Sequence, residues 1–357
     1  MDQDRFGRRA VFCQIIPPYL LERVAEQADT PQLREQARLS LELDSCHRQG
    51  RLLCPSGAVA ERATTVAAEP PAPERTISDA QHRERLPGRR VRVEGQDPTA
   101  DASVNQAYDG LGHTFRLFLE VYGRDSIDGT GLPLNATVHF GRDYDNAFWN
   151  GEQMVFGDGD GRLFTDFTKP VDVIGHELTH GVTQYSADLA YQGQSGALNE
   201  SVSDVFGALV KQYALGQSTD QADWLIGAGL LGPGINGIAL RSMKEPGTAF
   251  DDPLLGKDPQ PGSMADYVDT EEDHGGVHIN SGIPNRAFYL VATALGGHAW
   301  DRAGRIWYDT LTGPQLTPAS DFTAFARATV EAAKARYGDG AERGAVADAW
   351  GEVGVRL

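Results

Sequence analysis

Cysteine is almost absent from this 357-residue sequence, and the three cysteines, Cys13, Cys46 and Cys54, all lie near the start. The remaining chain can therefore form no disulfide of its own and can offer no thiolate to a metal ion. The odd number of cysteines gives no sign of passage through an oxidising compartment. The first residues also lack the apolar stretch of a signal peptide. We therefore expect a cytoplasmic protein, or one released without a signal peptide by a non-standard route.

Long hydrophobic runs and an excess of basic residues are lacking as well. No apolar run is long enough to span a membrane, and the formal net charge is −18. Such an acidic chain is a poor partner for nucleic acids. At 357 residues the chain exceeds the usual size of a single core, so we expect two lobes.

A metal-binding motif is present in the stretch V-I-G-H-E-L-T-H, which begins at Val173. In a helix, His176 and His180 lie on one face and can both reach one metal ion. Glu177, next to the first histidine, is placed to act on a water molecule at that ion. The five-residue pattern also occurs by chance in ordinary helices, so the neighbouring sequence must show whether it is a metal site.

That context is G-A-L-N-E-S-V-S-D, which begins at Gly196. Glu200 can supply a third ligand, and two histidines with one carboxylate leave the fourth position of a catalytic zinc site open. Asp204 follows one helical turn later and can accept the free ring N–H of a ligand histidine. The alternative is a solvated acidic helix, which the combined arrangement disfavours.

These motifs belong to a longer set that occurs in one order. From about Arg75 to the C-terminus, the chain resembles the thermolysin family of zinc metallopeptidases. The matching stretches are R-T-I-S-D-A-Q, N-A-F-W-N-G, Q-M-V-F-G-D-G-D-G, D-V-I-G-H-E-L-T-H, G-A-L-N-E-S-V-S-D, L-R-S-M and D-H-G-G-V-H-I-N-S-G. The resemblance implies an α+β fold with a β-rich N-terminal lobe (75–190), an α-helical C-terminal lobe (191–357) and zinc in the cleft between them.

The resemblance also implies roles for residues outside the zinc motif. His278 and Tyr191 would stabilise the oxyanion of the reaction intermediate, with Asp273 supporting His278 and Asn199 supporting the site. Asn146, Ala147 and Arg241 would bind the main chain of the substrate. Phe164, Val173 and Leu240 would line an apolar pocket for a bulky residue after the cleaved bond. Apolar residues are most often core, so the pocket members are individually ambiguous.

The first 54 residues are expected to form a separate helical unit that is too short to hold a core alone. Its P-P-Y-L pattern, Pro17 to Leu20, is similar to the propeptide of the protealysin-like branch of the family. The resemblance implies that Pro17, Pro18, Tyr19 and Leu20 inhibit the enzyme by covering its cleft. An unrelated N-terminal appendage remains the alternative. Residues 55–74 read as a linker that is cut during maturation.

A thiolate of this leader could also cap the zinc ion, with Cys46 or Cys54 as the candidates, although most lone cysteines are simply buried. Calcium is not expected at the family's usual double site, since Lys211 stands where a carboxylate would be and its ammonium group can replace the ion's charge. Asp158 and Asp160 predict a hairpin turn rather than a calcium loop.

Two functions remain open at this stage. The first is a zinc-dependent neutral endopeptidase made as a proenzyme, whose partners are peptide substrates, its own propeptide and, if one exists, a dedicated protein inhibitor. The second is a catalytically silent, zinc-stabilised binding module that its leader keeps closed. Every residue that the family's reaction requires is present in the sequence, and this favours the enzyme.

Overall fold

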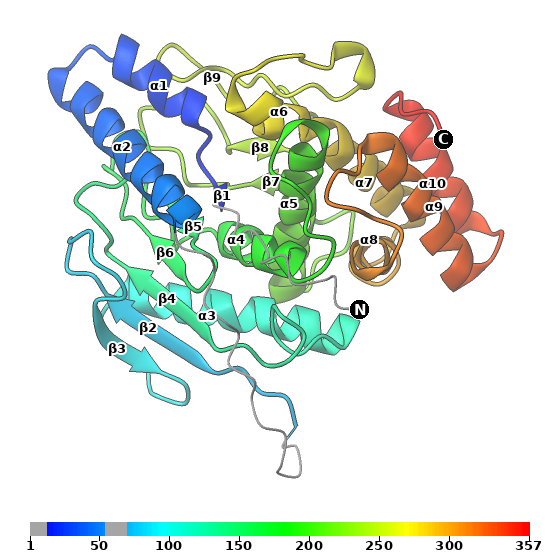
Figure 1. The fold of residues 1–357 in the computed structure, drawn as a ribbon, viewed down its shortest axis with the longest axis horizontal. Helices are drawn as coiled ribbons and strands as arrows, with labels where there is room; N and C mark the ends of the chain where they lie inside the picture. Colours follow the sequence, from blue (N-terminus) through cyan, green and yellow to red (C-terminus); the bar gives the residue numbers. More distant parts are fainter. Residues whose placement is uncertain (1–12, 54–69) are drawn as a thin grey trace.

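The computed structural model describes residues 13–53 and 70–357, including all side chains except those of residues 46–53. A mixed sheet and a long helix form one side of the molecule, and a group of helices forms the other (Figure 1). Among the described residues, no helix is long and apolar enough to cross a membrane. The expected linker lies largely outside the described residues.

The sheet has six strands in the order β1-β5-β6-β4-β2-β3. The strands are β1 (Cys13–Gln14), β2 (Arg75–Asp79), β3 (Arg89–Val93), β4 (Leu134–Val138), β5 (Ala147–Trp149) and β6 (Met154–Phe156). Strands β2, β4 and β6 run parallel, whereas β1 and β5 pair antiparallel. The first strand belongs to the leader, which thus forms one edge of the sheet.

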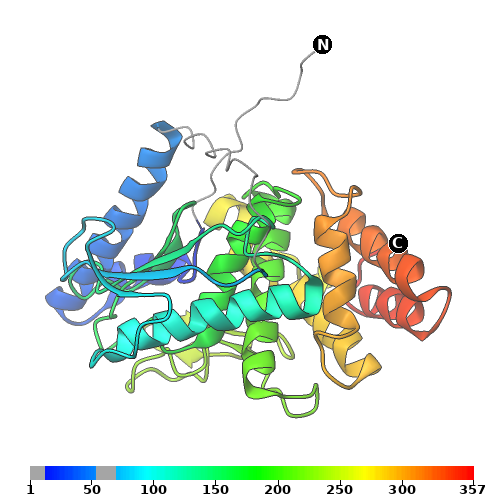
Figure 2. The same ribbon diagram turned by 90° about the horizontal axis from the view of Figure 1, so that it is seen from below.

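Two helices connect the sheet to the rest of the molecule. Helix α3 (Ala102–Arg116) packs against β2 and β4 and continues into a short π-helix, Leu117–Val121. Asp101 caps α3 by accepting the N–H groups of Ser103 and Val104. Helix α4 (Val171–Gln184) packs against α3, β5 and α5 and is buried along nearly its whole length. In Figure 2, α3 lies along one side of α4 and α5.

The helical lobe contains α5 (Gly193–Leu215), α6 (Asp273–Asn280), α7 (Gly282–Leu295), α8 (Ala303–Thr312), α9 (Phe322–Tyr337) and α10 (Ala341–Glu352). Between α5 and α6 lie two short strand pairs and a 3-10 turn: β7 (Leu225–Ile226) with β8 (Arg241–Ser242), β9 (Asp251–Asp252) with β10 (Gly256–Lys257), and Met264–Asp266. The α-helical character predicted for the C-terminal lobe is confirmed.

The leader forms two helices beside this framework, α1 (Pro18–Gln27) and α2 (Pro31–Leu53). Leu20, Leu21 and Val24 of α1 are buried, which explains how so short a unit is stable: its apolar face packs into the core of the larger body. Pro18 occupies the first turn of α1, where a missing N–H costs nothing.

The predicted hairpin at the D-G-D-G stretch is wrong. Strand β6 ends at Phe156, and the chain then forms a loop to Phe164, whose partner is Leu231 of the helical lobe. The side chain of Asp160 stabilises this loop by accepting the backbone N–H groups of Arg162 and Leu163. The aspartate-glycine sequence therefore marks a loop that the Asp160 side chain stabilises, and it does not mark the turn of a β-hairpin.

Candidate active site

Helices α4 and α5 approach each other closely because each carries a glycine at the contact. A Cβ atom on Gly207 would lie 2.5 Å from the backbone oxygen of Asp172, and one on Gly175 would lie 3.0 Å from the side chain of Val210. Neither atom has room. The glycines thus set the distance at which α5 presents its carboxylates to the histidines of α4.

His176, His180 and Glu200 meet at this contact. The two Nε2 atoms lie 3.0 Å apart, and each lies 3.5 Å from an oxygen of Glu200. Donor atoms around a tetrahedral zinc ion with bonds of about 2.0–2.2 Å are separated by roughly 3.3–3.6 Å. All three side chains are buried, and the Oε2 atom of Glu200 has no hydrogen-bond partner among the described residues. The donor set therefore fits a zinc ion.

The opposite nitrogen of each histidine ring is held by a neighbour on α5. His176 Nδ1 lies 2.8 Å from Asp204 Oδ1, and His180 Nδ1 lies 2.8 Å from Asn199 Oδ1. These contacts fix the ring orientation and leave both Nε2 atoms facing the metal position. Asp204 also accepts two hydrogen bonds from Arg241. Burial raises the pKa of the Asp204 carboxyl, but Arg241 and His176 lower that pKa by more, so the carboxyl stays ionised.

Glu177 lies beside the three metal-binding residues and is fully buried. Its Oε2 atom accepts the backbone N–H of Trp149 at 3.0 Å, while its Oε1 atom has no partner among the described residues. Burial and the nearby Glu200 carboxylate raise the pKa of Glu177 well above its ordinary value. A carboxylate of raised pKa accepts a proton readily, as a general base must.

His278 faces the same position from α6. Its Nδ1 atom lies 2.6 Å from Asp273 Oδ1, and its backbone N–H also donates to Asp273. The chain turns sharply between the two residues through positive φ angles, 83° at Gly275 and 73° at Gly276, which glycine adopts without strain. Burial lowers the pKa of His278, but Asp273 and Glu200 raise it to about 9. The hydroxyl of Tyr191 lies 3.1 Å from His278 Nε2 and also donates to Glu200.

The leader enters this site as an extended strand. Ile15 donates its N–H to the carbonyl of Ala147 at 3.2 Å, and Ile16 donates its N–H to Asn146 Oδ1 at 3.1 Å. The side-chain amide of Asn146 also donates to the Ile16 carbonyl. The two residues expected to bind the main chain of a substrate are therefore occupied by the main chain of the leader.

Two successive carbonyls of the leader contact charged groups of the site. The Gln14 carbonyl lies 3.2 Å from His278 Nε2, and the Ile15 carbonyl accepts a hydrogen bond of 3.2 Å from Arg241. Both leader residues are buried. The peptide bond between them is thereby held between the two side chains.

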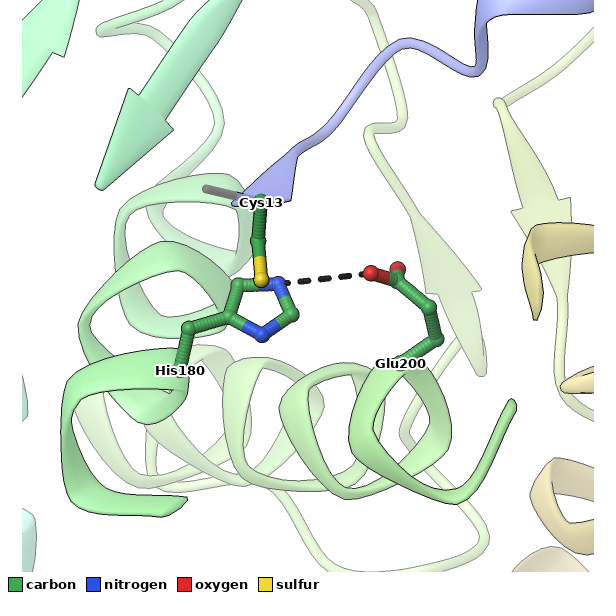
Figure 3. A group of neighbouring side chains, drawn as sticks. All are labelled: Cys13, His180 and Glu200. Atoms are coloured by element: carbon green, nitrogen blue, oxygen red, sulfur yellow. Dashed lines mark ion pairs between the residues drawn. The ribbon is translucent and has the colours of Figure 1, made fainter. Parts of the chain in front are cut away.

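Cys13 is the leader residue that comes to the metal-binding side chains. Its Sγ atom and ligand atoms of His180 and Glu200 all lie within 4.8 Å of one another. Figure 3 shows the sulfur atom beside the imidazole ring of His180, from which a dashed line runs to Glu200. Cys13 was not among the expected capping residues; the side chain of Cys46 and the whole of Cys54 lie outside the described residues.

The remaining predicted residues are buried or partly buried. Phe164, Val173 and Leu240 are at most 3% exposed and belong to the main core cluster. Pro17 and Leu20 of the leader are buried as well, and Pro18 and Tyr19 are partly buried. Burial and the Asp273 carboxylate raise the pKa of the Tyr19 hydroxyl, which puts this ring close to the site.

Sequence reasoning missed the leader residues Cys13 and Gln14 and the α2 residue Asp44, which receives a hydrogen bond from Asn146. One signal could have found the first two. Cys13 and Gln14 directly precede the apolar I-I-P-P-Y-L segment, and any extended chain that places those prolines at a cleft also brings the residues before them into it. No sequence signal points to Asp44.

Comparison with known proteins agrees with this geometry. Residues 77–184 match the model of the thermolysin metallopeptidase catalytic domain, and residues 187–355 match that of the thermolysin metallopeptidase alpha-helical domain. The chain is 52% identical over 347 residues to an extracellular metalloprotease of Pectobacterium carotovorum, covering 97% of each chain. It is 43% identical over 263 residues to thermolysin of Alicyclobacillus acidocaldarius, covering 71% of this chain and 46% of that protein.

A solved structure supports the same assignment for the whole chain, leader included. The precursor of protealysin, a metalloproteinase from Serratia proteamaculans, superimposes with a TM-score of 0.87 at 52% identity, covering 96% of this chain and 100% of that one. The matched domains, the zinc-binding donor set and the leader in the cleft lead to one conclusion: this chain belongs to the thermolysin family of zinc metallopeptidases.

Proposed function

We propose that the protein is the latent precursor of a neutral endopeptidase, and that its leader inhibits it by lying in the cleft as a substrate would. The observation that carries this proposal is the pair of successive carbonyls, Gln14 at His278 and Ile15 at Arg241. In the family, the matching histidine stabilises the oxyanion and the matching arginine binds the next carbonyl. The Gln14–Ile15 peptide bond thus occupies the position of a bond to be cleaved.

The same register supports a preference for bulky apolar residues after the cleaved bond. Ile15 follows the Gln14–Ile15 bond and is fully buried. The expected pocket residues are themselves apolar and buried. Because this position is buried, a substrate with a polar residue there would lose hydration without gaining an apolar contact.

The reaction needs little from the protein beyond the groups already described. A zinc ion held by His176, His180 and Glu200 would polarise the peptide carbonyl and lower the pKa of a water molecule at the site. The Oε1 atom of Glu177, which has no partner among the described residues, would accept a proton from the attacking water, and Glu177 would then pass that proton to the leaving amine. His278 and Tyr191 donate to the oxygen that becomes negatively charged, and Asp273 holds the ring of His278.

Cys13 explains why the leader can be held in substrate position without being cleaved. Its sulfur is close enough to His180 and Glu200 to act as the fourth donor to the zinc ion. Thiolates are preferred zinc ligands and would take the place of the water that Glu177 must activate. With that position filled, the bound peptide bond has no nucleophile.

We also propose that the protein does without calcium at the family's double site. Lys211 Nζ lies 2.8 Å from Asp172 and 2.8 Å from Asp223 and donates to the Leu225 carbonyl. The ammonium group thus sits among three oxygens and supplies the positive charge that a calcium ion would bring. A cytoplasmic location, or release without a signal peptide, and a dedicated inhibitor stay predictions.

The proposal is tested by following the intact mass of the purified protein over time beside Glu177→Ala, with zinc content measured by elemental analysis. The wild type is expected to lose about 6–8 kDa by cleavage in the linker, while Glu177→Ala stays full length with equal zinc. Glu331→Ala, which changes an exposed glutamate of α9, serves as the control and should mature normally.

The opposite result would support the silent binding module. It would consist of a wild type that stays intact and that cleaves no casein-like substrate even after limited proteolysis of the linker. Loss of the leader from Glu177→Ala at the wild-type rate would instead show that another protease performs maturation.

A further inference from the structure

A second group of metal-ligating side chains lies at the sheet, outside the catalytic cluster. His82 follows β2, His139 directly follows β4, and Asp158 follows β6. Because these three strands run parallel, their carboxyl ends meet at one edge of the sheet. There, one ligand atom from each side chain lies within 4.8 Å of the other two.

The side chains of this group lie close to one another. His139 Nδ1 lies 2.8 Å from Asp158 Oδ1, and His82 Nδ1 lies 3.3 Å from Asp158 Oδ2. Donors to one zinc ion are separated by roughly 3.3–3.6 Å, so both separations lie within about half an ångström of that range. The centroids of the two imidazole rings are 5.5 Å apart.

A fourth residue orients the more buried histidine. His139 Nε2 lies 2.9 Å from Asp101 Oδ2. Asp101 is itself fixed, since its other oxygen caps helix α3. A carboxylate on the far nitrogen of a histidine is the usual arrangement behind a metal ligand, because it sets the ring's orientation and leaves the near nitrogen for the ion.

The backbone holds the two histidines in place without an ion. The N–H of His82 donates to the carbonyl of His139 at 2.9 Å. Both residues adopt positive φ angles, 57° and 54°, which is uncommon outside glycine. The side chain of His82 is 55% exposed, so water can complete the coordination and an ion can enter from solvent.

We propose that His82, His139 and Asp158 form a second metal site, for a transition-metal dication such as zinc, with Asp101 positioning the His139 ring. Two imidazole nitrogens and one carboxylate suit zinc or nickel, whereas calcium and magnesium prefer oxygen donors alone. An ion at this position would join the ends of three strands and the start of α3. Its role is structural, and the proposal does not depend on catalysis.

The competing explanation needs no metal. The hydrogen bonds that its ring donates to the Asp158 and Asp101 carboxylates raise the pKa of His139 to about 9, against the opposing effect of burial, so a protonated His139 could bridge the two carboxylates. In that case the imidazole of His82, which faces Asp158 from one side of the bridge, would contribute little. The two explanations therefore differ in what His82 does.

The experiment counts zinc ions in the full chain carrying Glu177→Ala, which keeps the precursor whole. After dialysis against micromolar zinc, elemental analysis is expected to give two ions per chain. Adding His82→Ala should reduce this to one, whereas adding His298→Ala, at an exposed histidine outside both clusters, should leave two. The melting temperature should rise with zinc in the parent and the His298 variant, and rise less in the His82 variant.

Two results would overturn the proposal. A single ion in the parent would mean that only the catalytic site binds zinc and that His139 is a bridging imidazolium. Two ions retained in the His82 variant would mean that other ligands, such as Cys46 and Cys54, hold the second ion. Neither result bears on the catalytic site, which His82 does not contact.

Discussion

Two clusters of two histidines and a carboxylate occur among the described residues, and they differ in how the fold assembles them. In the catalytic cluster, both histidines stand on one helix, and every donor is buried among groups that hold it. In the sheet-end cluster, each donor follows a different strand and one imidazole is largely exposed. The first is thus built to control one reactive position, and the second to link backbone segments.

Removing one histidine from each cluster should give the largest difference between the two clusters. His176→Ala should abolish peptidase activity and reduce zinc at the catalytic site, because two remaining donors hold zinc poorly. His139→Ala is the matched change in the other cluster and should leave activity on casein unchanged while lowering thermal stability. Activity assays on both purified variants, normalised to folded protein, check this. Equal loss of activity in both would show that the clusters are not separate.

Lys211 adds a third case, in which a side chain replaces the cation. Burial lowers the pKa of its ammonium group, but Asp172 and Asp223 raise it above the ordinary value, so it is charged. Lys211→Ala would leave Asp172, which is 1% exposed, without its partner, and should lower the free energy of unfolding by about 3–5 kcal/mol. Urea unfolding measures this, with Lys257→Ala at an exposed lysine as the control.

Calcium provides the complementary test of the same position. Wild-type stability should not change when calcium is added or removed with a calcium-selective chelator. A melting temperature that falls on calcium removal would refute the idea that Lys211 does the work of the ion.

Asp204 and Asp101, the carboxylates that contact the far ring nitrogens of His176 and His139, give the most closely matched pair of changes. Asp204→Asn should weaken zinc binding at the catalytic site about 10–100-fold, and Asp101→Asn should do so at the sheet end. Asparagine caps a helix as well as aspartate does, so Asp101→Asn tests the contact with His139 alone. Competition with a coloured zinc chelator reports both affinities. An unchanged affinity at either site would mean that its carboxylate does not position a ligand.

Cys13 distinguishes the clusters in another way, since, within the part of the chain that the structure describes, the sulfur of Cys13 lies near the catalytic cluster alone. Cys13→Ser should speed loss of the leader about tenfold, which corresponds to about 1.4 kcal/mol of weaker holding. A time course of intact mass measures the rate, and Glu177→Ala combined with Cys13→Ser should remain whole. A leader lost no faster than in wild type would show that thiolate binding does not maintain latency.

The sequence allowed prediction of the catalytic cluster because its chemistry is local. His176 and His180 are four residues apart, and Glu200 and Asp204 repeat that spacing on the next helix, so helical periodicity alone brings each pair to one face. The two-lobed fold followed from a resemblance that spans most of the chain.

What the sequence did not reveal depends on contacts between distant segments. His82, His139 and Asp158 come together only because three strands are parallel, and strand order cannot be read from spacing. Cys13 was overlooked because it lies outside any metal motif, and its position follows from antiparallel pairing with Trp149. The predicted D-G hairpin failed because Asp160 caps a loop instead.

The pairing of β1 with β5 has a consequence for the newly made chain. An unpaired edge strand offers its N–H and carbonyl groups to any extended segment, including another copy of the same strand, and so promotes aggregation. In the precursor, Cys13 and Gln14 cover β5 from within the same chain. The β5 edge, which must later bind substrate peptides, is therefore protected during folding. It would become able to pair with other extended segments only after the leader has been removed.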